Sequence, residues 1–397
     1  LEQRTSVEQR VLREARVLEL QLPASVQEAE WSPSTALASI APEVRAVVLR
    51  DARLRCSALV IDGAHGPEPA IIADWESPGR GGELHAATTS GHMHFVMGRL
   101  GQRTYLYDAP TLQEPQPAEA SAVLLGGRAA SNYFHWWVEH LTKLRFLVDD
   151  PDAKRRALVV NEQLPPQFME ALQAILGGPW PGGMLFWRQP QALNCAELMV
   201  LTHPAVTAED PGAGPEAMLR CEPDDLRWLA DRVLAELREQ DRSGCRRLHL
   251  ARNGDRRAVS AEPLAQVLEA RGFETIAPET LTFAEQVRLF REAEIIVSSS
   301  GAALTNIIFC RPGTQVIILN AMRHRQNPVF QILGSAAGVD VVQAVGPQQS
   351  APPTYGPAAD LDALHQPYVV SARTLANALD HAERRLAQAR AASAETQ

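Results

Sequence analysis

Short apolar runs alternate with amphipathic segments through the second half of the chain. Four of these runs predict strands: 247–251, 273–277, 294–298 and 315–319. Helices are predicted between them, one ending at Gly272, one opening with the capping-box pattern Thr282-Phe283-Ala284-Glu285, and one at 303–309. This order predicts a parallel sheet with right-handed crossovers, which binds ligands at the carboxyl ends of its strands.

The first half of the chain shows a similar but less regular alternation. Short β-branched runs bounded by Gly, Pro or Asp predict strands at 46–49, 58–61, 71–75, 94–97, 122–125, 158–160, 184–187 and 198–201. Helices are predicted at 133–148, 166–176 and 224–240. Residues 5–20 have the pattern of an amphipathic helix, and a Pro/Ser-rich linker follows as far as Pro42. The whole chain is therefore predicted to be an α/β protein.

Composition shifts divide the chain into four parts. A charged turn at 241–244 marks the main boundary, and a Pro/Gly-rich stretch at 346–367 precedes a final helix at 373–391. The predicted parts are an N-terminal helix and linker at 1–42, an α/β domain at 43–243, a Rossmann-like domain at 244–345, and a loop with a C-terminal helix at 346–397.

Charge and cysteine content narrow the class of protein. The 397 residues carry a formal net charge of −9 and no long basic stretch, so no nucleic-acid partner is expected. The five cysteines are widely spaced and form no C-x-x-C pair, which favours a reducing compartment over a disulfide framework. No run reaches the roughly 18 apolar residues of a membrane span. We therefore expect a cytoplasmic protein without a transmembrane segment.

The first candidate motif lies on the helix predicted at 133–148. At about 100° per residue, one side of this helix is apolar: Trp137, Leu141, Leu144 and Val148. The other side is polar: Asn132, His135, Glu139 and Lys143. His135 and Glu139 are one turn apart, so they can act together, with Glu139 as a general base whose pKa is raised by partial burial. The alternative is a solvated polar face with a Glu139–Lys143 ion pair.

A second motif follows the strand at 247–251. Arg252, Arg256 and Arg257 come directly after this strand, where the ligand edge of the sheet is expected. Guanidinium groups there could neutralise a diphosphate through bidentate hydrogen bonds. The alternative is a solvated basic turn.

A third motif joins the strand at 294–298 to the next helix. Its small residues, Ser298 to Ala303, place free backbone N–H groups and a helix N-terminus at the same edge, which is typical of an anion site. Candidate contacts are Ser300, Gly301, Ala302, Thr305 and Asn306. The pattern is neither G-x-G-x-x-G nor a Walker A sequence, which argues against a dinucleotide enzyme or a P-loop NTPase. Tight strand–helix packing is the alternative.

No metal site is expected. His85, His92 and His94 are close in sequence, but no carboxylate or cysteine pattern completes a ligand set.

Taken in order, the three motifs resemble the glycosyltransferase 61 family over about residues 120–345. The first resembles the family's N-Y-x-H-W-x-x-E stretch through Asn132, Tyr133, His135, Trp136 and Glu139. The second resembles L-Y-L-S-R…R-R through Leu248, Leu250, Arg252, Arg256 and Arg257. The third resembles a block that contains G-A-x-L-T-N and P-G-T, through Gly301, Ala302, Leu304, Thr305, Asn306 and 312–314.

The resemblance implies a GT-B-like fold of two Rossmann-like domains facing a cleft, with a C-terminal helix. It also implies an inverting, metal-independent glycosyltransferase of surface polysaccharide biosynthesis that takes a nucleotide sugar, with UDP-sugar as the first expectation, and needs no cofactor. Glu139 and His135 would be catalytic, Asn132 and Trp136 would contact the glycan acceptor, and the arginines and the 300–306 turn would bind the donor. The protein could then work at the inner face of the membrane or in an assembly complex.

Two other functions fit parts of the pattern. One is a catalytically silent binding or scaffold module of a polysaccharide assembly complex, and the retention of His135 and Glu139 counts against it. The other is a different nucleotide-sugar enzyme such as an epimerase, which the missing glycine fingerprint disfavours.

Overall fold

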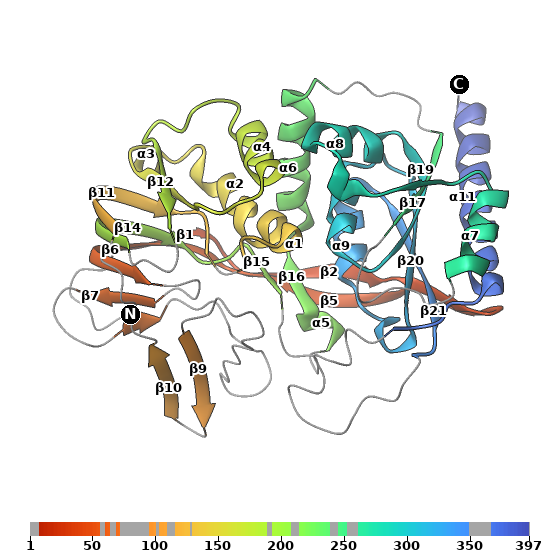
Figure 1. The fold of residues 1–397 in the computed structure, drawn as a ribbon, viewed down its shortest axis with the longest axis horizontal. Helices are drawn as coiled ribbons and strands as arrows, with labels where there is room; N and C mark the ends of the chain where they lie inside the picture. Colours follow the sequence, from red (N-terminus) through yellow and green to blue (C-terminus); the bar gives the residue numbers. More distant parts are fainter. Residues whose placement is uncertain are drawn as a thin grey trace. The chain divides into compact units, whose positions relative to one another are not determined.

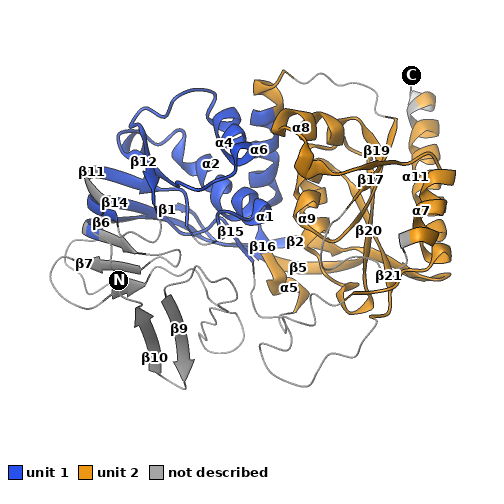
Figure 2. Cartoon of the chain, viewed as in Figure 1, with its two compact units in different colours: residues 1–18, 40–210, 220–233 blue, residues 19–39, 211–219, 234–397 orange. Residues whose placement is uncertain are grey.

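The chain folds into two compact units. The computed structural model describes residues 8–55, 60–63, 69–71, 95–100, 103–108, 116–127, 129–188, 193–207, 214–238, 245–251, 261–348 and 367–396. Unit 1 comprises residues 1–18, 40–210 and 220–233, and unit 2 comprises residues 19–39, 211–219 and 234–397 (Figure 2). Both units are assembled from separate stretches of sequence, and the N-terminal forty residues contribute to each.

Unit 2 contains the parallel sheet predicted for the second half of the chain. Its order is β18-β17-β19-β20-β21-β3-β4, and every pair is parallel except β3 with β4. The strands are β17 (Arg246–Leu250), β18 (Glu274–Ile276), β19 (Ala293–Ser299), β20 (Gln315–Ala321), β21 (Asp340–Gly346), β3 (Ala24–Gln27) and β4 (Glu30–Ser32). The central strands β19 and β20 are buried along their whole length, as expected for a sheet covered on both faces.

Helices cover both faces of this sheet. They are α7 (Ala261–Ala270), α8 (Phe283–Arg291), the 3₁₀ helix η4 (Ala302–Phe309), α9 (Val329–Ala337) and α11 (Ala372–Thr396), with the short 3₁₀ turns η3 (Pro278–Thr280) and η5 (Met322–His324). Figure 1 shows α7 and α11 on one face and α8 and α9 on the other. Leu375 and Leu379 of α11 pack against Ile317 and Val342 in one core cluster, so the C-terminal helix is an integral layer of the unit.

The capping box predicted at the start of α8 is formed. Thr282 Oγ1 accepts a hydrogen bond from the Glu285 N–H at 3.3 Å, and Glu285 Oε2 accepts one from the Thr282 N–H at 2.9 Å. Thr282→Ala is expected to lower the free energy of unfolding by about 1 kcal/mol, since the Glu285 N–H loses its side-chain acceptor and Glu285 Oε2 loses the hydrogen bond from the Thr282 hydroxyl. Urea denaturation checks this value, with exposed Glu279→Ala as the control expected to change it by less than about 0.5 kcal/mol. Equal effects of the two substitutions would contradict the capping role.

Unit 1 is built on a mixed sheet. The order is β13-β12-β11-β14-β6-β7-β8, with β1 also paired to β6. Strands β11 to β14 are parallel to one another, whereas β6 runs antiparallel to β14. The strands are β1 (Glu8–Arg13), β6 (Val44–Arg55), β7 (Val60–Gly63), β8 (Pro69–Ile71), β11 (Gln116–Leu124), β12 (Ala157–Asn161), β13 (Met184–Trp187) and β14 (Leu193–Leu201). The predicted α/β class, with two mostly parallel sheets and a C-terminal helix, is confirmed.

The helical segments of unit 1 lie mainly between its parallel strands. They are α1 (Tyr133–His135), η1 (Trp136–His140), η2 (Leu141–Lys143), α2 (Leu144–Leu147), α3 (Pro151–Lys154), α4 (Pro166–Leu176) and α6 (Pro223–Glu236). The remaining elements are the strand pairs β2 (Arg16–Leu22) with β5 (Thr35–Ala41), β9 (Phe95–Leu100) with β10 (Arg103–Asp108), and β15 (Ala205–Thr207) with β16 (Leu219–Cys221), together with α5 (Pro215–Met218). Within the described residues, no helix is both long and apolar enough to cross a membrane.

The helix predicted at residues 5–20 is wrong. The described part of this segment forms β1 and β2. Leu18, Leu20 and Leu22 recur at every second residue and are less exposed than Val17, Glu19 and Gln21 between them, which is the period of a strand. The predicted linker up to Pro42 is also ordered, since it contains β3, β4 and β5.

Candidate active site

The helical segment that carries the first motif is not a uniform α-helix. After the single turn of α1, residues Trp136 to His140 form a π-helical turn, and Leu141 to Lys143 form a 3₁₀ turn. Asn132 begins the segment, and its Oδ1 accepts a hydrogen bond from the Phe134 N–H at 3.0 Å. π-Helical turns are rare and occur often at functional sites. Here the turn contains Glu139.

Glu139 is buried, and both of its carboxylate oxygens are occupied. Oε2 lies 2.8 Å from His135 Nδ1, and Oε1 accepts a hydrogen bond from the Thr207 N–H at 3.1 Å. The backbone carbonyl of Glu139 lies 3.1 Å from His203 Nδ1. The carboxylate is therefore held by one group of its own helical segment, His135, and by one that is distant in sequence, Thr207.

The environment keeps Glu139 ionised. Burial raises the pKa of its carboxyl, but the charge of His135 and the hydrogen bond from His135 outweigh burial and lower the pKa well below its ordinary value of 4.5. The expected rise in pKa is thus wrong in sign, because the histidine one turn away outweighs burial. The alternative of a solvated polar face is wrong, since Glu139 and Lys143 are both buried, and Glu139 pairs with His135.

The pairing fixes how His135 presents its other ring nitrogen. An ionised carboxylate only accepts hydrogen bonds, so Nδ1 of His135 carries the proton that points to Glu139. When the ring is neutral, Nε2 then has the free lone pair. The side chain of His135 is 22% exposed and that of Glu139 is 12% exposed. His135 is therefore the more accessible member of the pair.

Two further histidines adjoin Glu139 and were not predicted from the sequence. His140 Nδ1 donates to the Leu125 carbonyl at 3.1 Å, and the rings of His140 and His203 meet edge to face with centroids 5.6 Å apart. Burial, followed by the charges of Lys143 and His140, holds the pKa of His203 well below 6.5. His203 is therefore neutral at neutral pH and positions the Glu139 backbone by donating from Nδ1. The signal in the sequence for these two histidines is His140, which directly follows Glu139.

The two predicted acceptor residues have mainly structural contacts. Trp136 is fully buried, its ring stacks on Phe168 with centroids 6.2 Å apart, and its Nε1–H donates to the Phe168 carbonyl at 3.2 Å. Its ring thus lies in the core and does not face an acceptor. Asn132 is exposed, and its Oδ1 caps the helical segment.

The third motif lies at the carboxyl end of β19, as predicted. Gly301 is extended, and the helix that follows is the 3₁₀ helix η4, whose first hydrogen bond runs from the Leu304 N–H to the Gly301 carbonyl. The preceding N–H groups therefore lie at a helix N-terminus. Ser300, Gly301 and Ala302 are half-buried and can be reached by a ligand.

The side chains of Thr305 and Asn306 lie on η4, after this turn, in the interior of unit 2. Both are fully buried, and the Asn306 amide donates to Gln286 Oε1 of α8 at 2.9 Å. The Asn306 contact joins η4 to α8, and the donor contact expected of Thr305 and Asn306 from the sequence stays a prediction.

The arginines of the second motif, Arg252, Arg256 and Arg257, lie outside the described residues, as do His85, His92 and His94. The strand that precedes the arginines is described: Leu250 ends β17 level with Ser298 of the neighbouring β19. The chain thus leaves β17 at the same sheet edge as the 300–302 turn. No group of three or more His, Cys, Asp or Glu side chains could hold a metal ion in the part of the chain that the structure describes.

Two α/β units, with a buried Glu–His pair in one and an anion-type turn at a parallel sheet edge in the other, are consistent with a GT-B-like transferase. Residues 133–317 match the family model described as Glycosyltransferase 61, so this region is a glycosyltransferase domain and its implied activity is sugar transfer. The match confirms the resemblance found in the sequence, and it includes His135, Glu139 and the 300–306 turn. No curated protein matches the chain.

Proposed function

We propose that the protein is an inverting glycosyltransferase. It transfers a sugar from a nucleotide-sugar donor to a hydroxyl of a glycan or glycoconjugate acceptor in surface polysaccharide biosynthesis. The observation that carries this proposal is the His135–Glu139 pair, which lies on a π-helical turn inside the matched glycosyltransferase domain.

In this proposal His135 is the general base and Glu139 is its positioning residue. Nε2 of His135 takes the proton of the acceptor hydroxyl as the oxygen attacks the anomeric carbon. The bond from that carbon to the diphosphate breaks, and the configuration inverts. Glu139 is less suited to take the proton itself, because both of its oxygens are occupied and its lowered pKa makes it a weak base at neutral pH.

Unit 2 binds the donor in this proposal. The N–H groups of Gly301 and Ala302 and the guanidinium groups of Arg252, Arg256 and Arg257 stabilise the negative charge that grows on the departing diphosphate. The cationic side chains supply the charge that a metal ion supplies in other transferases, so the reaction is proposed to be metal-independent. UDP-sugars are the first donors to test.

A thermal-shift titration tests the donor assignment. The purified chain is titrated with UDP-, GDP-, CMP- and TDP-linked sugars and with the free nucleotides. We expect one nucleotide class to raise the melting temperature, because a ligand that binds only the folded state stabilises it. Arg252→Ala should abolish the shift, whereas exposed Arg373→Ala should leave it unchanged.

The same titration separates the transferase from the scaffold alternative. A catalytically silent module would show no stabilisation by any nucleotide, and no sugar transfer. A shift that survives in Arg252→Ala would contradict the arginine assignment while leaving donor binding in place.

A further inference from the structure

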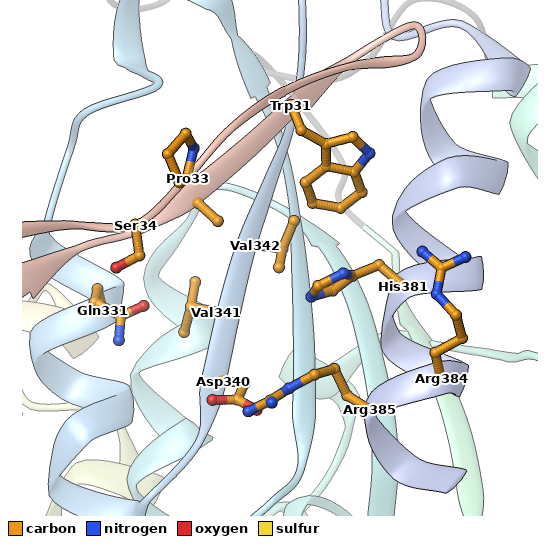
Figure 3. A pocket seen from close by; sticks show the side chains of 11 residues that line it. Trp31, Pro33, Ser34, Gln331, Asp340, Val341, Val342, His381, Arg384 and Arg385 are labelled. Atoms are coloured by element: carbon orange, nitrogen blue, oxygen red, sulfur yellow. The ribbon is translucent and has the colours of Figure 1, made fainter. Parts of the chain in front are cut away.

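A pocket of about 560 Å³ lies in unit 2 at the end of the sheet opposite the 300–302 turn. Its floor is apolar, with Val341 and Val342 of β21, and one wall is formed by Trp31 of β4 and His381 of α11 (Figure 3). The two rings are in contact, with centroids 4.7 Å apart and planes tilted by 39°. Trp31 remains 38% exposed. The pocket thus presents a large aromatic surface to solvent.

The pocket is distinct from the proposed donor site. Ser299 is level with Leu319 of β20, which is level with Ala344 of β21, whereas the pocket residue Asp340 comes four positions earlier. Four strand residues span about 13 Å. All the lining residues also lie outside the span 133–317 that matches the glycosyltransferase model. The pocket therefore lies outside the matched domain.

Polar groups around the pocket are only partly used by the fold. Asp340 Oδ2 accepts hydrogen bonds from Arg385 at 3.0 Å and Gln315 at 3.1 Å. Among the described residues, Asp340 Oδ1, the Gln331 amide and the Arg384 guanidinium have no hydrogen-bond partner. These three groups come from β21, α9 and α11, so they surround the apolar floor from different elements.

The side chains that line the pocket carry a net formal charge of +1. Two arginines face one aspartate, and Arg385 is already paired with Asp340, so Arg384 is the cation left over. Burial lowers the pKa of His381, and the neighbouring Arg384 and Arg385 lower it further, so the ring is neutral at neutral pH. His381 therefore extends the aromatic wall and adds no charge.

We propose that this pocket binds an acidic saccharide, in which an unsubstituted face of a sugar ring lies on Trp31 and its carboxylate pairs with Arg384. Asp340 and Gln331 would bind the ring hydroxyls. A volume of about 560 Å³ is within the usual range of small-ligand pockets. A nucleoside diphosphate fits less well, because its two phosphates would face a single unpaired arginine.

This binding has a consequence that rests on the proposed function. A saccharide site away from the transfer site would retain an acidic acceptor glycan between transfers, since a second contact raises the effective concentration of the tethered chain. The pocket would then contribute to acceptor choice without taking part in the chemistry.

Equilibrium binding of the full chain to tetrasaccharides of glucuronic, galacturonic and mannuronic acid tests the proposal, with calorimetry or saturation-transfer NMR as the readout. Each is compared with its carboxyl-reduced counterpart, which keeps the rings and removes the charge. We expect at least one acidic tetrasaccharide to bind more tightly than its reduced form. Trp31→Ala should weaken that binding by at least about tenfold, and Arg384→Ala should weaken it by about tenfold and remove the preference for the acidic form.

Trp228→Ala and Arg373→Ala serve as matched controls and should leave saccharide binding unchanged, with melting temperatures confirming that every variant is folded. The proposal is overturned if none of the three acidic tetrasaccharides binds at millimolar concentration. It is also overturned if the reduced forms bind equally well, or if Trp31→Ala has no effect. The measurement uses no nucleotide, so its result is independent of whether the donor assignment succeeds.

Discussion

His135→Ala is expected to lower the rate of sugar transfer by about a hundred- to ten-thousandfold, the usual contribution of a positioned general base. The substitution removes the only ring nitrogen that Glu139 orients toward the accessible side of the pair. Donor binding should change by less than about twofold, because the base acts on the acceptor hydroxyl. Single-turnover rates at saturating donor, together with the donor Kd from the thermal-shift titration, measure the two effects separately.

Glu139→Gln distinguishes a positioning carboxylate from a direct base. If Glu139 only orients His135, Glu139→Gln should lower the rate of sugar transfer no more than His135→Ala does. The double variant should be about as slow as His135→Ala alone, because the two residues act as a unit. Ser131→Ala, at an exposed position beside the motif, is the control. A Glu139→Gln variant much slower than His135→Ala would return the role of base to Glu139.

The pH dependence gives a second readout of the same assignment. Because Glu139 stays ionised far below its ordinary pKa of 4.5, its titration cannot limit the rate near neutral pH. A loss of activity on acidification toward pH 5 would therefore report the protonation of a group other than Glu139.

The regular part of unit 2 could be predicted because its signals are local. The capping box at Thr282, the turn at Gly272 and the apolar runs of β19 and β20 each lie within one element. Parallel order then follows from the alternation of strands and helices. Helix α9 and strand β21 continue the same alternation but were not predicted from the sequence.

The N-terminal strands could not be predicted in the same way. Strand β3 pairs with β21, so that Ala24 lies opposite Val342, more than three hundred residues away. A four-residue strand between prolines has little local signal, and its pairing depends on a partner that the neighbouring sequence does not reveal. The pocket could not be predicted for the same reason, because Trp31 of β4 and His381 of α11, which form its aromatic wall, are far apart in the sequence.

The contacts of the His135–Glu139 pair could also be predicted only in part. The spacing of His135 and Glu139 predicted their contact, since residues one turn apart meet on a helix. It did not predict the π-helical turn, or the contacts from Thr207 and His203 that complete the shell around Glu139. The raised pKa was expected from burial of Glu139, whereas the charge and the hydrogen bond of the neighbouring His135 outweigh burial and lower the pKa.

Asp225→Ala is expected to destabilise unit 1 by roughly 3–5 kcal/mol, the cost of removing one partner from a buried ion pair. Asp225 is fully buried in the first turn of α6, and its Oδ2 accepts a hydrogen bond from Arg13 Nη1 at 2.6 Å. Arg145 Nε lies 3.4 Å from the other oxygen. The same Arg13 guanidinium donates to the carbonyls of Pro42 and Pro204. Removing the carboxylate would leave Arg13, 17% exposed, without its counter-charge.

The neighbouring Asp224→Ala provides a matched control, because its side chain is exposed and lies in the same helical turn. It should change the free energy of unfolding by less than about 0.5 kcal/mol. Urea titration followed by tryptophan fluorescence measures both variants.

Comparable effects at the two positions would show that the start of helix α6, and not the ion pair, determines the loss of stability. The double variant Arg13→Met/Asp225→Leu replaces the ion pair with an apolar pair of similar volume. If it recovers most of the free energy of unfolding lost in Asp225→Ala, that loss arises from the unpaired charge of Arg13.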